Sequence, residues 1–381
     1  MSNRKLAVLG IVAVFMVIWA VVQSRVSNRP KTEMDRPVYL IQGLDPANID
    51  SIVVGTGENA VTLKRQQGNF VVVNKDNYPA KASEINNLIT KTLEIQTSQF
   101  VTDNAANHED LGLTEGKANT LVKFFKPDSS LLTGVVGGKA KELGQGTYVR
   151  LASSDTVYVA PSLPWLGGTA MSYIEQELIS VKREDIVSVT LSSENGEYTL
   201  KTTDNGKSVI PENIPAGKKF KSSDGDSVFT ALTSLRFDDV MKKTGDLTFD
   251  KQYICRLKDS TVYTLNIAQK DGKTYVTCES DYTDKTPVTI GLKAEAEEEL
   301  KKKEAKLLAQ ESAIKFARKH QGWVYEIAEW KAKNLTKKLS DLFEDEEKPK
   351  ETDEVKDPNT IKLDETPAPT IKEPNTVEHE S

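Results

Sequence analysis

The stretch that decides the fold runs from Asn48 to Lys81 and reads NIDSIVVGTGENAVTLKRQQGNFVVVNKDNYPAK. Five of its residues return later in the chain at one constant offset of 137 positions: Ile49, Ser51, Thr62, Leu63 and Lys64 recur as Ile186, Ser188, Thr199, Leu200 and Lys201. The turn at 77–81 returns at 213–218, with the offset slipped by one residue. Self-similarity at a fixed spacing is the signature of a repeated structural unit. The sequence therefore predicts two tandem copies of one unit.

The first copy, predicted to span 38–168, is typical of an α+β unit built from antiparallel strands and one helix. Apolar and β-branched runs separated by glycine-containing turns predict strands at 49–54, 60–65, 69–74, 119–126, 131–137, 146–151 and 156–160. Between the third and fourth strands, Ile85, Leu88, Ile89 and Leu93 fall at helical spacing, which predicts an amphipathic helix over 82–94. Trp165 is expected to close the copy.

The second copy, predicted over 173–343, repeats this order. Its strands are expected at 185–192, 197–203, 207–211, 251–258, 261–268, 273–279 and 323–327. Its helix is expected at 224–235, with Ser223 and Asp226 at capping-box spacing and Leu232 on the inner face. Aromatic residues stand at matching places in the copies, which predicts core packing or, alternatively, a ligand groove between the copies: Tyr148, Tyr158, Trp165, Tyr275, Tyr325 and Trp330.

A charged helix, predicted at 293–320, is inserted before the last strand of the second copy. Glutamates four residues before lysines support such a helix without burial. Leu300, Leu307 and Ile314 form a thin apolar stripe at heptad spacing, with charged residues at the positions that would complete a coiled-coil seam. We expect this stripe to be a docking edge for a partner; the alternative is that the helix packs on its own sheet. A further amphipathic helix is predicted at 328–343.

The segment Leu6–Val22 is a run of 17 uncharged residues and is predicted to be a transmembrane anchor. A cleaved signal peptide is the alternative, because Val22-Gln23-Ser24 resembles a small-x-small cleavage site. The length of the run and Trp19 near its end favour an uncleaved anchor. The predicted topology has residues 1–5 in the cytoplasm, a linker at 23–37, and the rest of the chain outside a bacterial inner membrane.

The net charge of −6 is concentrated at one end of the chain. Residues 344–381 hold 13 acidic and 5 basic residues together with several prolines, and this tail is predicted to be disordered. The remaining residues are close to neutral, so the sequence lacks the basic excess of a nucleic-acid-binding protein.

No pattern in the sequence identifies a catalytic, cofactor-binding or metal-binding residue. His108 is expected in a solvated loop, His320 as a cation at the end of the inserted helix, and His379 in the tail. The glycine-rich stretch 137–146 lacks the Lys-Ser or Lys-Thr of a phosphate-binding loop. Cys255 and Cys278 are predicted on strands separated by a third, which favours unpaired, buried thiols over a disulfide.

The chain resembles the bacterial domain-of-unknown-function 4340 family. The motifs that carry this resemblance follow a single N-terminal anchor: an Asn-Ile-x-Ser-Ile strand at 48–52, a Tyr-Pro-Ala turn that opens a helix at 78–80, Leu111-Gly112-Leu113, a Gly-x-Tyr-Val-Arg strand at 146–150 and a Trp-x-Tyr-x-Ile strand at 323–327. The resemblance extends over about residues 38–340. Members often occur beside components of gliding-type ABC transporters, which implies an accessory role in the cell envelope. The family offers no catalytic residues to transfer, and the charged helix and acidic tail depart from its usual pattern.

We therefore expect a non-enzymatic, single-pass membrane protein that binds another envelope protein, with an ABC transporter subunit as one candidate partner. A module that binds glycan or another envelope polymer is the first alternative. A hydrolase with dispersed carboxylates is the second.

Overall fold

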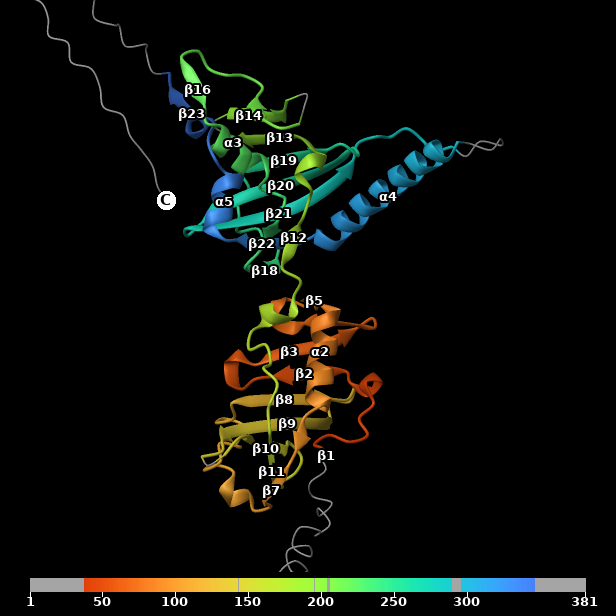
Figure 1. Cartoon of the computed structure of the whole chain (residues 1–381), viewed down its shortest axis with the longest axis vertical. Helices are drawn as coiled ribbons and strands as arrows, with labels where there is room; N and C mark the ends of the chain where they lie inside the picture. The colour runs from red at the N-terminus through yellow and green to blue at the C-terminus, as the bar shows by residue number, and fades with distance from the viewer. Residues whose placement is uncertain (1–37, 143, 195, 204–205, 290–295, 347–381) are drawn as a thin grey trace, which may run out of the picture.

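The computed structural model describes residues 38–142, 144–194, 196–203, 206–289 and 296–346. The predicted cytoplasmic N-terminus 1–5, anchor 6–22, linker 23–37 and most of the predicted tail lie outside these residues. Among the described helices, none is long and apolar enough to cross a membrane. The fold is α+β, as predicted, and Figure 1 shows two lobes stacked along the long axis of the molecule.

The first lobe (described residues 38–160) is built around an antiparallel sheet. Within the described residues this sheet has nine strands, in the order β5-β4-β3-β2-β8-β9-β10-β11-β7. In chain order these strands are β2 (Ser51–Val54), β3 (Val61–Gln66), β4 (Asn69–Val72), β5 (Tyr78–Pro79), β7 (Gln99–Thr102), β8 (Thr120–Phe125), β9 (Leu131–Ala140), β10 (Thr147–Leu151) and β11 (Val157–Ala160). Seven of them lie where the sequence predicts strands.

Helix α2 (Ala82–Leu93) packs on this sheet and confirms the helix predicted at 82–94. Its apolar stripe is buried at Ile85, Leu88 and Ile89, because these residues share the face turned toward the strands. The chain enters the lobe through β1 (Val38–Tyr39), which pairs with β6 (Gln96–Thr97) just after α2.

The second lobe (described residues 177–346) contains a sheet whose described strands number eight, in the order β15-β14-β13-β19-β20-β21-β22-β18. In chain order they are β13 (Ile186–Ser193), β14 (Gly196–Thr202), β15 (Val209–Pro211), β18 (Asp239–Lys242), β19 (Lys251–Leu257), β20 (Thr261–Lys270), β21 (Lys273–Tyr282) and β22 (Trp323–Ile327). A short ladder of β12 (Glu177–Ile179) with β17 (Leu235–Arg236) flanks this sheet.

Helix α3 (Ser222–Phe229) is shorter than the helix predicted at 224–235. Leu232 is buried, as predicted, but it lies in the turn that follows the helix. The predicted capping box is wrong, because the helix starts at Ser222 and Ser223 is already inside it. Asp226 instead forms an ion pair with Arg183 at 2.8 Å.

The helix predicted at 328–343 is broken into α5 (Glu329–Leu335) and the 3-10 turn η8 (Leu339–Leu342). The hydroxyl of Thr336 bonds back to the carbonyl of Ala332 at 2.9 Å, and the Tyr198 hydroxyl donates to the carbonyl of Lys337 at 2.8 Å. Both bonds satisfy carbonyl groups near the end of α5, where Thr336 leaves the helical backbone conformation (φ −126°, ψ 11°).

The predicted start of the disordered tail, residue 344, lies before the end of the folded second lobe. Strand β23 (Phe343–Asp345) pairs with β16 (Lys218–Phe220), so Glu344 and Asp345 belong to the folded second lobe. Burial of Phe343, which contacts Phe220, fixes the strand in place.

Helix α4 (Glu297–His320) is the described part of the predicted insertion 293–320. It lies along β21, as Figure 1 shows. Strand β22 pairs with β21 only at Thr274–Val276, whereas β21 continues to Tyr282. An open strand edge can pair with other chains and is often covered by a helix. We infer that α4 covers this part of the edge.

The lobes meet edge to edge, through β5 of the first sheet and β18 of the second (Figure 1). Lys75 forms an ion pair with Asp239 at 2.5 Å, and the Asp76 carboxylate accepts a hydrogen bond from the backbone N–H of Lys242 at 3.1 Å. Tyr78 is buried at this joint, with its ring edge-on to Trp323 at a centroid distance of 4.8 Å.

Candidate functional site

Helix α4 has two faces with opposite surroundings. With 3.6 residues per turn, positions 306, 309, 313, 316 and 320 fall on one side of the helix, and 300, 307 and 314 fall on the other. The first side packs on the sheet. Ala313 is buried, the Ser280 hydroxyl donates to its carbonyl at 2.6 Å, and the Phe316 ring lies edge-on to Tyr263 at 5.0 Å.

The predicted docking residues lie on the outer side. Leu300, Leu307 and Ile314 are 49%, 51% and 44% exposed. The helix packs on its own sheet through one face, as the alternative predicted, and leaves the Leu300–Leu307–Ile314 stripe in solvent, whereas docking of a partner stays a prediction. We call these three residues the outer stripe.

Ion pairs stabilise α4 on its packed side and on its exposed sides. Lys306, on the packed side, pairs with Asp284 at 2.7 Å and depresses the pKa of that carboxyl. On the exposed sides, Glu297 pairs with Lys301 at 2.6 Å and Glu311 with Lys315 at 2.7 Å, in the orientation that supports an isolated helix. The ion pairs and the packed face therefore stabilise α4, the helix that contains the outer stripe, without a partner.

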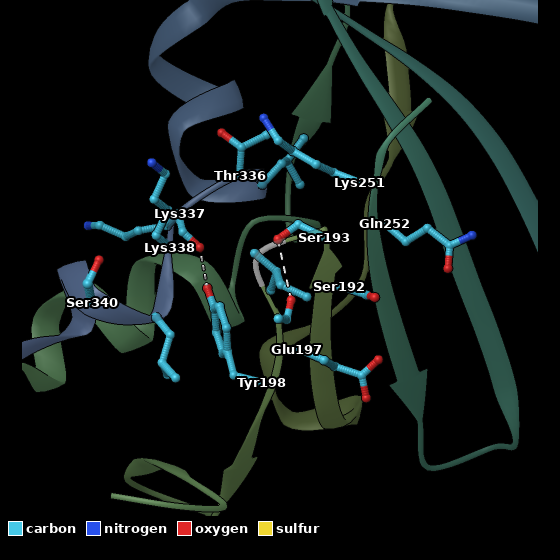
Figure 2. A pocket seen from close by; sticks show the side chains of 14 residues that line it. Ser192, Ser193, Glu197, Tyr198, Lys251, Gln252, Thr336, Lys337, Lys338 and Ser340 are labelled. Atoms are coloured by element: carbon cyan, nitrogen blue, oxygen red, sulfur yellow. Dashed lines mark hydrogen bonds between the residues drawn. The ribbon is translucent and has the colours of Figure 1, made fainter. Parts of the chain in front are cut away.

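A pocket of about 240 Å³ lies elsewhere in the second lobe, between the β13–β14 hairpin, the start of β19 and the connection from α5 to η8 (Figure 2). Tyr198 forms one wall, and its bond to the Lys337 carbonyl holds the connection against the hairpin. Burial raises the pKa of Tyr198, so its hydroxyl keeps its proton at neutral pH. Lys337 also pairs with Asp224 of α3 at 2.5 Å.

The polar groups of this pocket do not converge on one point. Figure 2 shows Glu197 and Gln252 pointing away from Lys337 and Lys338. The hydroxyl of Ser193 bonds to the carbonyl of Gly196 at 3.3 Å, and the residues that line the pocket include no histidine or cysteine.

The joint between the lobes contains a chain of buried polar groups. The Nδ1 atom of His320 lies 2.6 Å from the hydroxyl of Tyr325, which lies 3.4 Å from the hydroxyl of Tyr78. Burial lowers the pKa of His320 to about 3, with Lys319 adding to the shift, and raises the pKa of both tyrosines. All three side chains are therefore neutral at physiological pH.

Three sequence-based expectations are wrong here. His320 is buried and neutral, because it packs against Phe316 and Tyr325, and it does not act as a cation at the helix end. His108 is also buried, with Nε2 2.9 Å from the carbonyl of Asp155, because its loop folds against the turn before β11. Trp165 and Trp330 are 81% and 68% exposed and do not belong to the core.

Cys255 on β19 and Cys278 on β21 are both free and buried, with β20 between their strands. Burial raises the pKa of Cys255 to about 12 and also raises that of Cys278. A thiol that stays protonated reacts slowly, so these cysteines have the character of core residues. Within the described residues, no three His, Cys, Asp or Glu side chains are grouped as metal ligands would be.

The Figure 2 pocket and the buried polar chain have no signal in the sequence. Tyr198 and Lys337, like Tyr78 and Tyr325, are far apart along the chain and meet only through the fold. The outer stripe could be found because its residues belong to one helix.

The fold and these sites describe an α+β protein with two sheets that meet edge to edge and a helix, α4, that leaves one face in solvent. The family model "Domain of unknown function (DUF4340)" matches residues 71–252, from β4 in the first lobe to the start of β19 in the second. The chain therefore resembles the DUF4340 family, as its motifs indicate. No curated protein and no solved structure matches the chain.

Proposed function

We propose that this protein is a non-enzymatic accessory protein of the bacterial cell envelope, anchored by residues 6–22, that binds another envelope protein through the outer stripe of α4. The observation that carries the proposal is the exposure of Leu300, Leu307 and Ile314 on a helix whose opposite face is packed.

The partner that fits the outer stripe is an amphipathic helix. Apolar residues seven positions apart on an exposed helix can pack against the apolar face of a second helix. The stripe holds one apolar residue per heptad, so a pairing would be weaker than a full coiled coil and suits reversible docking. A subunit of an ABC transporter is the partner class that the family resemblance suggests.

The shape of the molecule is compatible with a spacer. The described chain begins at β1, at one end of the long axis, and finishes at β23, at the other end (Figure 1). With an anchor before β1, the second lobe and α4 would lie away from the membrane surface, where they can reach the exposed part of a partner.

We also propose that the lobes arose by duplication of one unit. The strand order β4-β3-β2-β8-β9-β10-β11-β7 corresponds, position by position, to β15-β14-β13-β19-β20-β21-β22-β18. Corresponding registers support this: Ser51 pairs with Lys64 as Ser188 pairs with Lys201, and Val149 pairs with Tyr158 as Val276 pairs with Tyr325. The Asn-x-Pro-Ala turns differ, because Pro79 lies just before α2 whereas β16 separates Pro215 from α3.

The docking proposal is tested with substitutions that leave the packed face intact. Changing Leu300, Leu307 and Ile314 together to Gln should abolish co-purification of the partner from detergent-solubilised membranes, with an unchanged melting temperature. The matched control is Leu308→Gln, because Leu308 is 55% exposed on the same helix but lies about 80° to 120° around the helix axis from the three stripe residues. Retention of the partner by the triple variant would contradict the proposal.

Anchorage is tested separately. A reporter that is active only outside the cytoplasm, fused after Ser381, should be active in cells, and alkaline extraction should leave the protein in the membrane pellet. Activity of a cytoplasm-only reporter at the same position would contradict the proposed topology.

A module that binds an envelope glycan is a second candidate function. It is favoured by the exposure of Trp165 and Trp330, because flat aromatic rings in solvent can stack on sugar rings. Replacing both tryptophans with Ala should then remove binding to purified cell-wall polymer without affecting the docking assay above.

A further inference from the structure

A pocket of about 280 Å³ opens in the first lobe, between the 3-10 turn η2 (Pro46–Asn48), the β3–β4 turn and the first turns of α2. It is separate from the outer stripe and from the pocket in Figure 2, which both belong to the second lobe. Ile85, Ile89 and Phe70 give it an apolar wall. The described residues that line it include one cation, Arg65 of β3, and no aspartate or glutamate.

The guanidinium group of Arg65 lies at the wall of this pocket. Its Cζ atom is 4.7 Å from the centroid of the Phe70 ring, and its two terminal nitrogens donate to the carbonyls of Gly68 and Pro46 at 3.5 and 3.4 Å. All three of these neighbours line the pocket. The Nε atom donates to the carbonyl of Ile49 at 3.0 Å. A guanidinium group has five N–H groups, so two of those on the terminal nitrogens have no acceptor within the described residues.

The second lobe shows what an arginine in the corresponding gap binds. There, Arg183 begins the 3-10 turn η7 (Arg183–Asp185), which corresponds to η2 at the offset of 137. Its terminal nitrogens donate to the hairpin-turn carbonyls of Gly206 and Lys207 at 3.2 and 3.5 Å. One of these nitrogens also donates to the carboxylate of Asp226 on α3 at 2.8 Å. The guanidinium group between the 3-10 turn, the hairpin turn and the helix therefore has a carboxylate partner in this lobe.

The buried positions of the two helices give the residue of α2 that corresponds to Asp226. Four of them match at one offset of 140 residues, namely Ile85, Leu88, Ile89 and Thr92 with Gly225, Val228, Phe229 and Leu232. At this offset Asp226 corresponds to Asn86, which lines the first-lobe pocket. The first lobe thus has a neutral amide where the second lobe has the carboxylate that binds its arginine.

The first lobe supplies no other counter-charge to Arg65. Within the described residues, no carboxylate forms an ion pair with this arginine. The nearby carboxylate of Asp45 accepts a hydrogen bond from the backbone N–H of Ala47 at 2.9 Å, and Glu84 on α2 pairs with a lysine. The pocket therefore combines a half-buried cation that has spare N–H groups with an apolar wall.

We propose that this pocket binds the carboxylate of a small aliphatic compound. The carboxylate accepts hydrogen bonds from the terminal N–H groups of Arg65, as Asp226 accepts from Arg183 in the second lobe. Hydrogen bonds between a guanidinium group and a carboxylate are among the strongest in proteins. The aliphatic part of the ligand packs against Ile89 and Phe70, where apolar burial adds to the affinity. A free acid and the C-terminal residue of a polypeptide share this chemistry.

The proposal is tested on the full-length protein in detergent, with ¹³C-labelled isoleucine δ1 methyl groups. The signals of Ile85 and Ile89 are assigned by their loss in Ile85→Val and Ile89→Val. Titration with hexanoate should shift both signals saturably and leave that of Ile210, in the second lobe, unchanged. Hexanamide has the same aliphatic part without the charge and should bind at least about tenfold more weakly.

A second titration, with N-acetyl-alanyl-leucine, distinguishes the two sources of the carboxylate. If this compound alone shifts the Ile85 and Ile89 signals, the ligand is a polypeptide end; if hexanoate shifts them as well, a free acid suffices. Binding of hexanamide as tight as that of hexanoate, or binding of neither carboxylate, would overturn the proposal.

Variants test the role of the charge. Asn86→Asp gives the first lobe the carboxylate that Asp226 provides in the second, so it should pair with Arg65 and weaken hexanoate binding about tenfold or more. Asn87→Asp, the matched control, adds the same charge at the next exposed position of α2, which does not line the pocket, and should bind hexanoate as the unmodified protein does. Arg65→Gln should also weaken binding about tenfold or more. Unchanged hexanoate binding in Asn86→Asp, or in a folded Arg65→Gln protein, would overturn the proposal.

Discussion

The hydroxyl oxygen of Tyr78 lies 3.4 Å from that of Tyr325, and these side chains come from different lobes. Tyr325 is the central member of the buried chain, because it also contacts Nδ1 of His320 at 2.6 Å. The joint between the lobes and the end of α4 are therefore connected through one hydroxyl group.

We predict that Tyr325→Phe is more destabilising than Tyr78→Phe. Removal of the Tyr325 hydroxyl leaves His320 and Tyr78 without their shared partner, which should reduce the free energy of unfolding by about 1–3 kcal/mol. Removal of the Tyr78 hydroxyl breaks one long hydrogen bond and should reduce it by less than about 1 kcal/mol. Urea unfolding of both variants measures the difference, and the reverse order would contradict the central position of Tyr325 between Tyr78 and His320.

His320 should make the protein less stable in mild acid. Its folded pKa is about 3, whereas an exposed histidine has a pKa near 6.5. Between these values the unfolded state holds a proton that the folded state lacks, so acid favours unfolding. The free energy of unfolding should fall by up to about 1.4 kcal/mol per pH unit as the pH drops from about 6.5 to 4.5, above the range where most carboxylates titrate.

The control for this pH effect is His320→Gln, which removes the titrating group. This variant should lose much of the pH dependence between 6.5 and 4.5 even if its stability at pH 7 is lower. An unchanged pH slope in urea titrations would show that His320 is not the group responsible.

Each lobe has its own test of core packing. Ile89 of α2 and Leu232 after α3 are buried, so replacing either by Ala should destabilise the protein by about 2–5 kcal/mol. Leu308→Ala changes a residue that is 55% exposed and should alter stability by less than about 0.5 kcal/mol. Equal effects at Leu232 and Leu308 would contradict the burial described here.

The elements that the sequence predicts well are those whose signals are local. Helix α2 and the β2–β3 hairpin follow from periodicity and turn residues within one short segment. The break between α5 and η8 has no local signal, and the Tyr198 hydroxyl that contacts it at the Lys337 carbonyl comes from a strand remote in sequence. The burial of His320 likewise depends on Tyr325 and Phe316 being brought together around it.

The proposed duplication predicts that corresponding hairpins are interchangeable. Replacing residues 49–64 with a copy of residues 186–201 keeps the length, the register and an apolar or aromatic residue at each inward-facing position, so the chimera should still unfold cooperatively. A control chimera shifted by one residue turns every side chain to the opposite face of the sheet and should not fold. If both chimeras fail to fold, the correspondence between the hairpins is not supported.

The most direct test of the central claim is photo-crosslinking in living cells from the outer stripe of α4. A photoreactive residue at position 307 or 314 should give one discrete adduct with another envelope protein. The same residue at position 214, where Ile214 is 56% exposed in the same lobe, should give none. Absence of an adduct at 307 and 314, or an identical adduct from 214, would contradict docking through α4.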